Sequence, residues 1–230
     1  TFHYATGHPF PLFLAPMAGV SEAPFRRLCR RYGADVVVSE FLSSEGLRRK
    51  NERTLEMAAF DATERPIGIQ IFGAEPDAMA EAAALVTEYF RPEFVDINFG
   101  CPVKKVVRRN GGSGCLKDLD LVERVIRAVV KATPLPVTVK IRSGWDETTR
   151  DPVSIARRCE DAGAGALTLH ARTRTQMFTG QARWEEIAAV VDALTIPVIG
   201  NGDVSTPAPV LRTPAATARA AALTARPRPG

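Results

Sequence analysis

The chain has 230 residues, of which 45% are hydrophobic, so it can form one large domain or two small ones around a sizeable core. It has no stretch of about 18 apolar residues that would predict a transmembrane helix, and residues 1–11 lack the basic-then-apolar pattern of a signal peptide. Its 30 basic and 26 acidic residues give a net charge of +4, all of it from four arginines after Asp203, so global charge is weak grounds for nucleic-acid binding.

Short apolar runs alternate with helix-like stretches as far as residue 203. The apolar runs predict seven strands, at residues 12–15, 35–39, 67–71, 94–98, 137–141, 166–170 and 197–201. Amphipathic stretches predict helices at residues 23–32, with Ser21 as its cap, and at 77–89, 119–132, 153–162 and 184–193. Nearly continuous apolar strands alternating with helices are typical of a parallel sheet covered on both faces. A doubly wound sheet and a (β/α)8 barrel both fit this pattern.

Polar residues at the carboxyl ends of the predicted strands favour the barrel. A barrel gathers all its strand ends around one mouth, whereas an open sheet uses mainly the ends beside its switch point. No G-x-G-x-x-G sequence follows the first strand. We therefore predict an α/β fold of the TIM (β/α)8 type. The residues at these strand ends, all polar except the first, are Met17, Glu40, Gln70, Asn98, Lys140 with Arg142, His170, and Asn201 with Asp203.

The composition changes after Asp203. Residues 204–230 contain five Pro and eight Ala, with no aromatic and no acidic residue. This composition predicts a disordered or out-of-frame tail, in which residues 215–225 could form a weak helix on propensity alone. No eighth strand is expected, so the barrel would be incomplete, and its first and seventh strands would present unpaired edges.

The most informative heptad is 96–102, Asp-Ile-Asn-Phe-Gly-Cys-Pro. Most lone cysteines are small buried hydrophobes, but Cys101 stands between Gly and Pro at a strand end, where restricted backbone favours a reactive role. A thiol with a pKa near 8.5 can donate a proton at neutral pH. Cys29 and Cys159 lie in helical patterns and are predicted core residues, while Cys115 in a Gly-rich loop stays undecided. The four cysteines form no C-x-x-C pair, which argues against a disulfide scaffold or a zinc site and fits a reducing cytosol.

Other polar strand ends have both a functional and a structural interpretation. Lys140 could stabilise an anion in the mouth, or its ammonium could simply reach solvent. Gln70 suits a ring with alternating donor and acceptor edges, or it could be a capping amide. A lone His is more often structural than catalytic, but His170 followed by Arg172 and Arg174 suggests an anionic or polar ligand.

Two loops are candidates for phosphate binding. Turn chemistry alone explains Asn201-Gly202-Asp203, but its place after the seventh strand also suits a phosphate site. Four basic residues beside Gly111-Gly112-Ser113-Gly114 could form a solvated flexible loop or a basic lid that meets phosphates. They are Lys104, Lys105, Arg108 and Arg109.

Six motifs occur in order across residues 12–203 and together resemble those of the bacterial tRNA-dihydrouridine synthases of the B type. The resemblance implies a TIM barrel that holds FMN at its mouth, with NADPH or NADH as reductant. It also implies reduction of a uridine in tRNA to 5,6-dihydrouridine, with hydride passing from N5 of FMN to C6 and a proton from Cys101 to C5. The motifs are Leu14-Ala15-Pro16-Met17-Ala18-Gly19-Val20, Gln70-Ile71-Phe72-Gly73, Asp96-Ile97-Asn98-Phe99-Gly100-Cys101-Pro102, Val139-Lys140-Ile141-Arg142, His170-Ala171-Arg172-Thr173-Arg174 and Gly200-Asn201-Gly202-Asp203.

The resemblance also implies roles for individual residues. Those expected at the cofactor are Pro16, Met17, Ala18, Gln70, Lys140, His170, Asn201, Gly202 and Asp203. Those expected at the tRNA are Asn98, Arg142, Arg172, Lys104, Lys105, Arg108 and Arg109. Such a protein would be cytoplasmic, with tRNA as its partner and no metal or membrane contact, and we expect it to be a monomer.

This sequence departs from the family pattern in three ways. Phe99 replaces the usual Met before Gly-Cys-Pro, the eighth βα unit with its Gly-Arg phosphate clamp is absent, and so is the C-terminal helical tRNA-binding domain. The resemblance is expected to stop near Asp203, which suggests a truncated or frame-shifted gene product that retains FMN weakly. In this interpretation, residues 1–203 are the FMN-binding domain and residues 204–230 a tail.

Two other functions remain open from the sequence. Another FMN barrel could reduce free pyrimidines, as dihydroorotate or dihydropyrimidine dehydrogenases do, and activity on free uracil without tRNA would favour it. Alternatively, a chain lacking the clamp could be an inactive remnant that binds RNA weakly.

Overall fold

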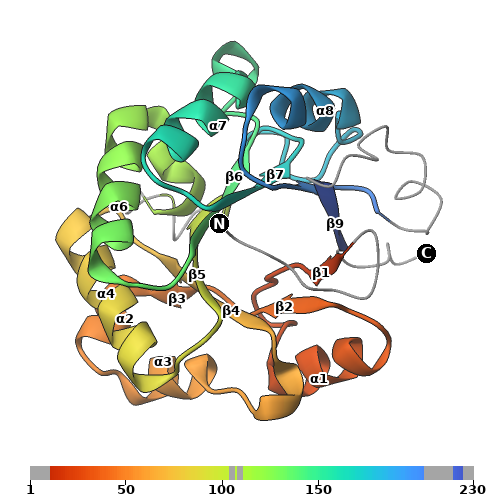
Figure 1. Cartoon of the computed structure of the whole chain (residues 1–230). Coiled ribbons are helices and arrows are strands. Elements are labelled where there is room, and N and C mark those ends of the chain that lie inside the picture. The colour runs from red at the N-terminus through yellow and green to blue at the C-terminus, as the bar shows by residue number, and fades with distance from the viewer. Residues whose placement is uncertain (1–10, 104–106, 108–110, 205–219, 225–230) are drawn as a thin grey trace.

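The computed structural model describes residues 11–103, 107, 111–204 and 220–224 of the chain. Its strands form a central barrel, and its helices pack around the outside (Figure 1). The strands are β1 (Leu12–Leu14), β2 (Val36–Val38), β3 (Leu42–Ser43), β4 (Ile67–Phe72), β5 (Phe94–Phe99), β6 (Val137–Arg142), β7 (Ala166–His170), β8 (Val198–Asn201) and β9 (Ala220–Thr224).

Every strand pairing in the described residues is parallel. The order is β2-β1-β9-β8-β7-β6-β5-β4, with the short β3 beside β4, and β2 also pairs with β4. The pairings therefore return to their starting point. The α/β barrel of the TIM type that the sequence predicts is confirmed.

The structure corrects the prediction for part of the C-terminal segment. Ala220–Thr224 forms β9, which lies between β1 and β8, whereas the sequence predicted no strand here. Leu14 pairs with Thr224, and Asn201 pairs with Leu223. The first and seventh predicted strands are therefore not unpaired edges. Local propensity missed β9 because a run rich in Ala has little strand preference of its own, and the two neighbouring strands supply the pairing.

The helices lie close to where the apolar periodicity places them. Asp118 caps α6 by accepting a hydrogen bond from the backbone N–H of Leu121, and Asp151 caps α7 through that of Ser154. Ser21 is not the cap of α1, because its hydroxyl is bonded to the backbone of Met17. The helices are α1 (Ala23–Arg31), α2 (Ser44–Arg48), α3 (Glu52–Ala58), α4 (Pro76–Tyr89), α6 (Leu119–Ala132), α7 (Pro152–Asp161) and α8 (Trp184–Ala193), with short 3-10 turns η1 (Ala62–Glu64), η2 (Gly112–Lys117) and η3 (Glu147–Thr149).

Apolar side chains fill the amino-terminal end of the barrel. Phe13, Val36, Phe94 and Ile199 are buried in one cluster inside it. Gly68 makes room for this packing, because a Cβ at that position would lie 2.1 Å from the Phe94 ring. A filled amino-terminal end leaves the carboxyl ends of the strands as the place for a ligand.

No helix among the described residues is long and apolar enough to cross a membrane. A larger cluster of apolar side chains packs the helices against the outside of the barrel.

Candidate functional site

Parallel register places a set of polar side chains together inside the barrel mouth. Successive residues of a strand point to opposite faces, so residues that pair across neighbouring strands share a face. The paired polar residues are Gln70 with Asp96, Asp96 with Thr138, Asn98 with Lys140, Lys140 with Thr168, Arg142 with His170, and His170 with Asn201.

Asn98 ties the thiol-bearing turn to the barrel wall. Its Oδ1 accepts hydrogen bonds from the backbone N–H groups of Gly100 at 3.0 Å and Cys101 at 2.8 Å. Its Nδ2 donates to Oε1 of Gln70 at 2.7 Å, and Nε2 of Gln70 donates to Asp96 at 2.5 Å. Asn98 and Gln70 are both buried, so this amide relay fixes the backbone that carries Cys101.

Cys101 is 7% exposed and lies two residues after the end of β5. Its carbonyl oxygen accepts from both the backbone N–H (3.1 Å) and the hydroxyl (2.8 Å) of Ser113, which secures the segment from the other side. Burial raises the pKa of the Cys101 thiol, while the charges of Arg142 and Lys140 act in the opposite direction. The thiol is therefore protonated at neutral pH, which suits a proton donor better than a nucleophile.

Lys140 and His170 share one amide oxygen. Oδ1 of Asn201 accepts from Nζ of Lys140 at 3.1 Å and bonds Nδ1 of His170 at 2.7 Å. Burial and the neighbouring Arg142 lower the pKa of Lys140 to about 8. Burial and the charge of Lys140 lower the pKa of His170 well below its usual value. At neutral pH, His170 is therefore neutral and Lys140 is the group that carries the charge.

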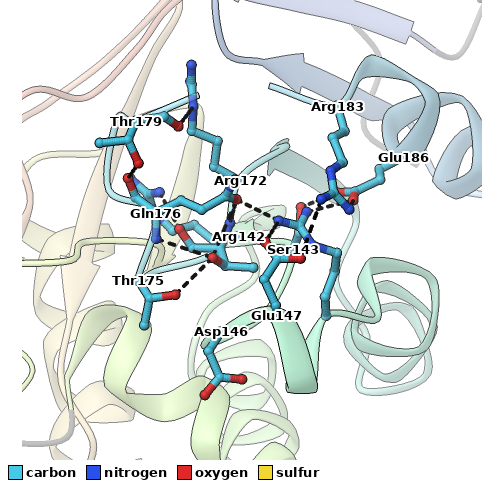
Figure 2. A network of polar contacts seen from close by, with 12 residues as sticks. Arg142, Ser143, Asp146, Glu147, Arg172, Thr175, Gln176, Thr179, Arg183 and Glu186 are labelled. Carbon is cyan, nitrogen blue, oxygen red and sulfur yellow. Dashed lines mark hydrogen bonds and ion pairs between the residues drawn. The ribbon is translucent and has the colours of Figure 1, made fainter. Parts of the chain in front are cut away.

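Arg142 and Arg172 bring further positive charge to the mouth. Both are buried, and Arg172 makes a two-oxygen ion pair with Asp203 at 2.7 Å. Figure 2 shows the two arginines in the polar network beside the mouth. Burial and then the charge of Arg172 lower the pKa of Arg142 to about 10. Cations that lower the pKa of a neighbouring cation mark a place where an anion would be stabilised.

A small hollow lies under these groups, inside the barrel. Pro16 and Lys140 line it, whereas Met17 and Ala18 follow in the turn after β1, with Met17 half-buried and Ala18 exposed. The full lining is Phe13, Pro16, Val38, Phe94, Asp96, Thr138, Lys140, Thr168 and Ile199. An ammonium has three donors, and the described residues give Lys140 one hydrogen bond, to Asn201. An acceptor atom of a bound ligand would complete the hydrogen bonds of the Lys140 ammonium.

Gly202 and Asp203 continue from β8 around the same edge. Gly202 has φ of +126°, and a Cβ there would lie 2.6 Å from Ala182, 3.8 Å from Arg172 and 3.9 Å from His170. Glycine is therefore required for this close approach. Asp203 also accepts a hydrogen bond from the backbone N–H of Ala182 at 2.8 Å. It therefore holds both Arg172 and the segment that leads into α8.

The structure brings most of the predicted site residues together at the mouth. Lys104, Lys105, Arg108 and Arg109 lie outside the described residues. Within the described part of the chain, no group of three His, Cys, Asp or Glu side chains is placed to hold a metal ion.

Three polar residues of the barrel interior were not predicted from the sequence. Asp96 accepts from the hydroxyl of Thr138 at 2.5 Å as well as from Gln70, and the hydroxyl of Ser39 accepts from the backbone N–H of Gln70 at 3.1 Å. Period-two alternation along β5 contained the signal for Asp96, because Asn98 two residues later must share its face. Asp96 lies in the middle of β5, so a pattern of polar strand ends does not identify it.

Comparison with known proteins gives one family. The model of the family described as "Dihydrouridine synthase (Dus)" matches residues 13–228, well past Asp203, where the resemblance was expected to stop. A tRNA-dihydrouridine synthase B from Pseudomonas aeruginosa is 46% identical over 200 residues, which cover 86% of this chain and 60% of that protein. A tRNA-dihydrouridine synthase B from Pasteurella multocida is 44% identical over 194 residues, covering 84% of this chain and 58% of that protein. The chain thus spans about 60% of the length of these relatives.

Solved structures support the fold. A nitroalkane oxidase from Streptomyces ansochromogenes aligns with a TM-score of 0.50 and 20% identity, covering 94% of this chain and 65% of that one. A FabK mutant from Thermotoga maritima aligns with a TM-score of 0.53 and 16% identity, covering 93% and 60%. At these identities the likeness concerns the fold alone.

Proposed function

Because the chain belongs to the dihydrouridine synthase family, of the bacterial B type, we propose that it reduces uridine to 5,6-dihydrouridine in tRNA. One observation carries this proposal beyond the family match. The thiol of Cys101 is buried and protonated, and Asn98 holds its backbone at the mouth of the barrel, beside the charges of Lys140 and Arg142. A proton donor and cations that favour an anion are what reduction of a polarised double bond requires.

The cofactor we infer is FMN, because its phosphate and its reduced ring are anionic and the mouth carries Lys140, Arg142 and Arg172. When bound, it would supply a hydride, and NADPH or NADH would serve as reductant. Lys140 would stabilise the negative charge of the reduced ring, and Pro16, Met17 and Ala18 would line it. Asn201, Gly202 and Asp203 would approach the ribityl and phosphate end. Arg172, which the resemblance placed at the tRNA, is paired with Asp203 and would supply charge at this end instead. The hydrogen-bonding capacity that Lys140 retains supports this assignment.

Cys101 would deliver the proton to C5 of the uracil ring while hydride is added at C6. Burial keeps this thiol protonated to a higher pH than an ordinary cysteine. The neighbouring cations would stabilise the thiolate left behind. Gln70 and Asn98 would act mainly by holding the thiol-bearing turn, since both side chains already bond within the wall.

The substrate would be a nucleobase that has left its stack. A base within a helix cannot reach the end of a barrel, so loops of folded RNA are the expected targets. The basic residues Lys104, Lys105, Arg108 and Arg109 would contact phosphates. A protein that modifies tRNA would work in the cytoplasm.

The test uses the purified chain with FMN, NADPH and unmodified tRNA, and mass spectrometry of digested tRNA as the readout. We expect dihydrouridine with the wild type, none with Cys101→Ala, and wild-type amounts with Cys29→Ala, whose thiol is half-buried on α1. All three proteins should bind FMN. Full activity of Cys101→Ala would overturn the assignment, and reduction of free uracil without tRNA would favour a reductase of free pyrimidines.

A further inference from the structure

A buried arginine beside the mouth joins three segments of the chain. The side chain of Arg150 is 8% exposed and follows η3 in the loop after β6. Its guanidinium donates to Glu147 through Nε at 2.8 Å, to Glu186 through Nη1 at 2.6 Å and to Gln176 through Nη2 at 2.6 Å. Glu147 is on the same loop, Glu186 lies in the first turn of α8, and Gln176 is in the loop after β7. The cluster therefore fixes the loops after β6 and β7 to one another.

Gln176 is the link between this cluster and the loop formed by residues 173–180 (Figure 2). Its Oε1 also accepts from the backbone N–H of Thr173 at 2.8 Å. Most of the loop is exposed. The backbone of Met177 has φ of +53°, a conformation that residues other than glycine rarely adopt. Such a conformation persists only where surrounding contacts enforce it. The bonds of Gln176 supply part of that constraint.

The same loop holds the two buried arginines of the mouth. Nη1 of Arg142 donates to the carbonyl oxygens of Thr173 at 2.9 Å and Met177 at 2.8 Å. Nε of Arg172 donates to the carbonyl oxygen of Thr179 at 3.2 Å. These carbonyl groups therefore help to set the direction of each guanidinium, together with the carbonyl oxygen of Gly100 for Arg142 and the Asp203 carboxylate for Arg172.

We propose that Gln176, clamped by Arg150, positions Arg142 and Arg172 for the anionic ligand of the mouth. The identity of that ligand as FMN rests on the proposed function, whereas the clamp rests on the contacts given above. Gln176 and Arg150 are positioning residues, because they act through the loop carbonyls rather than on the ligand. Charged groups that bind a ligand need such support to stay in the productive geometry.

Two substitutions at one position isolate the clamp. Gln176→Leu removes the acceptor oxygen but leaves the bonds from Arg150 to Glu147 and Glu186 in place, whereas Gln176→Glu keeps an acceptor at the same reach. We expect Gln176→Leu to weaken FMN binding about tenfold, as the loss of a hydrogen bond to a charged group predicts. The NMR signal of the Arg172 Nε–H should also lose its protection from solvent exchange. Gln176→Glu should keep both properties within about threefold of the wild type.

A matched pair of arginines controls for general destabilisation. Arg158 also pairs with two carboxylates, Asp120 at 2.5 Å and Glu123 at 2.6 Å, but on the outer helices α6 and α7. Arg150→Lys should resemble Gln176→Leu, because one ammonium cannot reproduce the fork that reaches three acceptors. Arg158→Lys should change neither FMN affinity nor the Arg172 signal.

Two results would overturn the proposal. One is an unchanged Arg172 Nε–H signal in Gln176→Leu. The other is a lost signal together with wild-type FMN affinity, since the loop would then not matter to the ligand. If the wild-type chain bound no FMN, the proposed cofactor would be wrong, and the Arg172 signal would still decide whether the clamp positions the arginine.

Discussion

Buried charge is handled differently at the outer wall of the barrel and at its mouth. At the wall, Arg26 of α1 and Glu64 of η1 are 1% and 0% exposed, and they form an ion pair at 2.6 Å. Other donors of Arg26 reach the carbonyl oxygens of Ser21 and Ala59, and Glu64 also accepts from the backbone N–H of Asp61. This pair is charge-balanced, and each nitrogen of the Arg26 guanidinium donates a hydrogen bond.

At the mouth, Asp203 pairs with Arg172, but Lys140 and Arg142 lie near one another and bond only to neutral oxygens among the described residues. Lys140 shares an amide oxygen with His170, and its pKa falls to about 8 because of burial and Arg142. The comparison teaches that a buried cation of the wall is paired with a carboxylate, whereas among the described residues neither Lys140 nor Arg142 has a carboxylate within ion-pair distance. Such an arrangement costs folding free energy, and it is explained if an anionic ligand completes it.

The largest expected effect comes from breaking the balanced pair. Arg26→Met leaves the Glu64 carboxylate buried without its partner, so the free energy of unfolding should fall by about 3–5 kcal/mol. Replacing both residues, as Arg26→Met with Glu64→Leu, should recover most of that loss. Denaturant unfolding of the two variants measures both values. A small loss in the single variant would show that water reaches this pair.

The opposite sign is expected at the mouth. Lys140→Met removes a cation whose charged form is disfavoured, so the ligand-free chain should gain about 1–2 kcal/mol at pH 7, allowing for the partial exposure of the side chain. The same unfolding measurement checks it. A loss of stability would mean that the ammonium is a structural partner of Asn201 rather than a group kept for a ligand.

The pH dependence sharpens this contrast. The pKa of Lys140 is about 8 in the folded chain, against an ordinary 10.5. Between these values the unfolded chain holds a proton that the folded chain has released, so stability should rise with pH across that window relative to Lys140→Met. Below pH 8 the full penalty is present. The difference in unfolding free energy between wild type and variant, measured at pH 7, 8.5 and 10, should shrink steadily; a constant difference would contradict the depressed pKa.

The smallest change in the free energy of unfolding is expected at Arg27, the residue that follows Arg26 of the balanced pair. Arg27 and Asp61 form an ion pair at 3.3 Å, with side chains 41% and 51% exposed. Solvent screens such a pair, so Arg27→Ala should cost no more than about 0.5 kcal/mol. A loss near that of Arg26→Met would show that exposure does not govern these pairs.

The sequence predicted the barrel well because its strands and helices have strong periodicities. It could not predict β9, whose strand conformation depends on pairing with β1 and β8 rather than on its own alanines. The short elements β3, α2 and α3 were also missed, since two to seven residues carry too little periodic signal.

Most residues of the candidate site lie at the carboxyl ends of strands, but Asp96 lies within β5 and Gln176 lies in a loop. Motifs singled out Cys101 and Lys140 as candidates, and the structure places both close enough to Arg142 for its charge to act on them. The bonds of Gln70 within the wall and the clamp at Gln176 could not be read from the sequence. They depend on which side chains meet across strands and loops that are far apart along the chain.

The central claim is that the charge gathered at the mouth is there for an anionic flavin. The most direct test is a titration of FMN into the ligand-free chain at pH 7, followed by flavin fluorescence, with wild type and Lys140→Met side by side. We predict saturable binding by the wild type and at least about tenfold weaker binding by the variant, despite its greater stability. Equal affinity in the two proteins, or no saturable binding by the wild type, would contradict the claim.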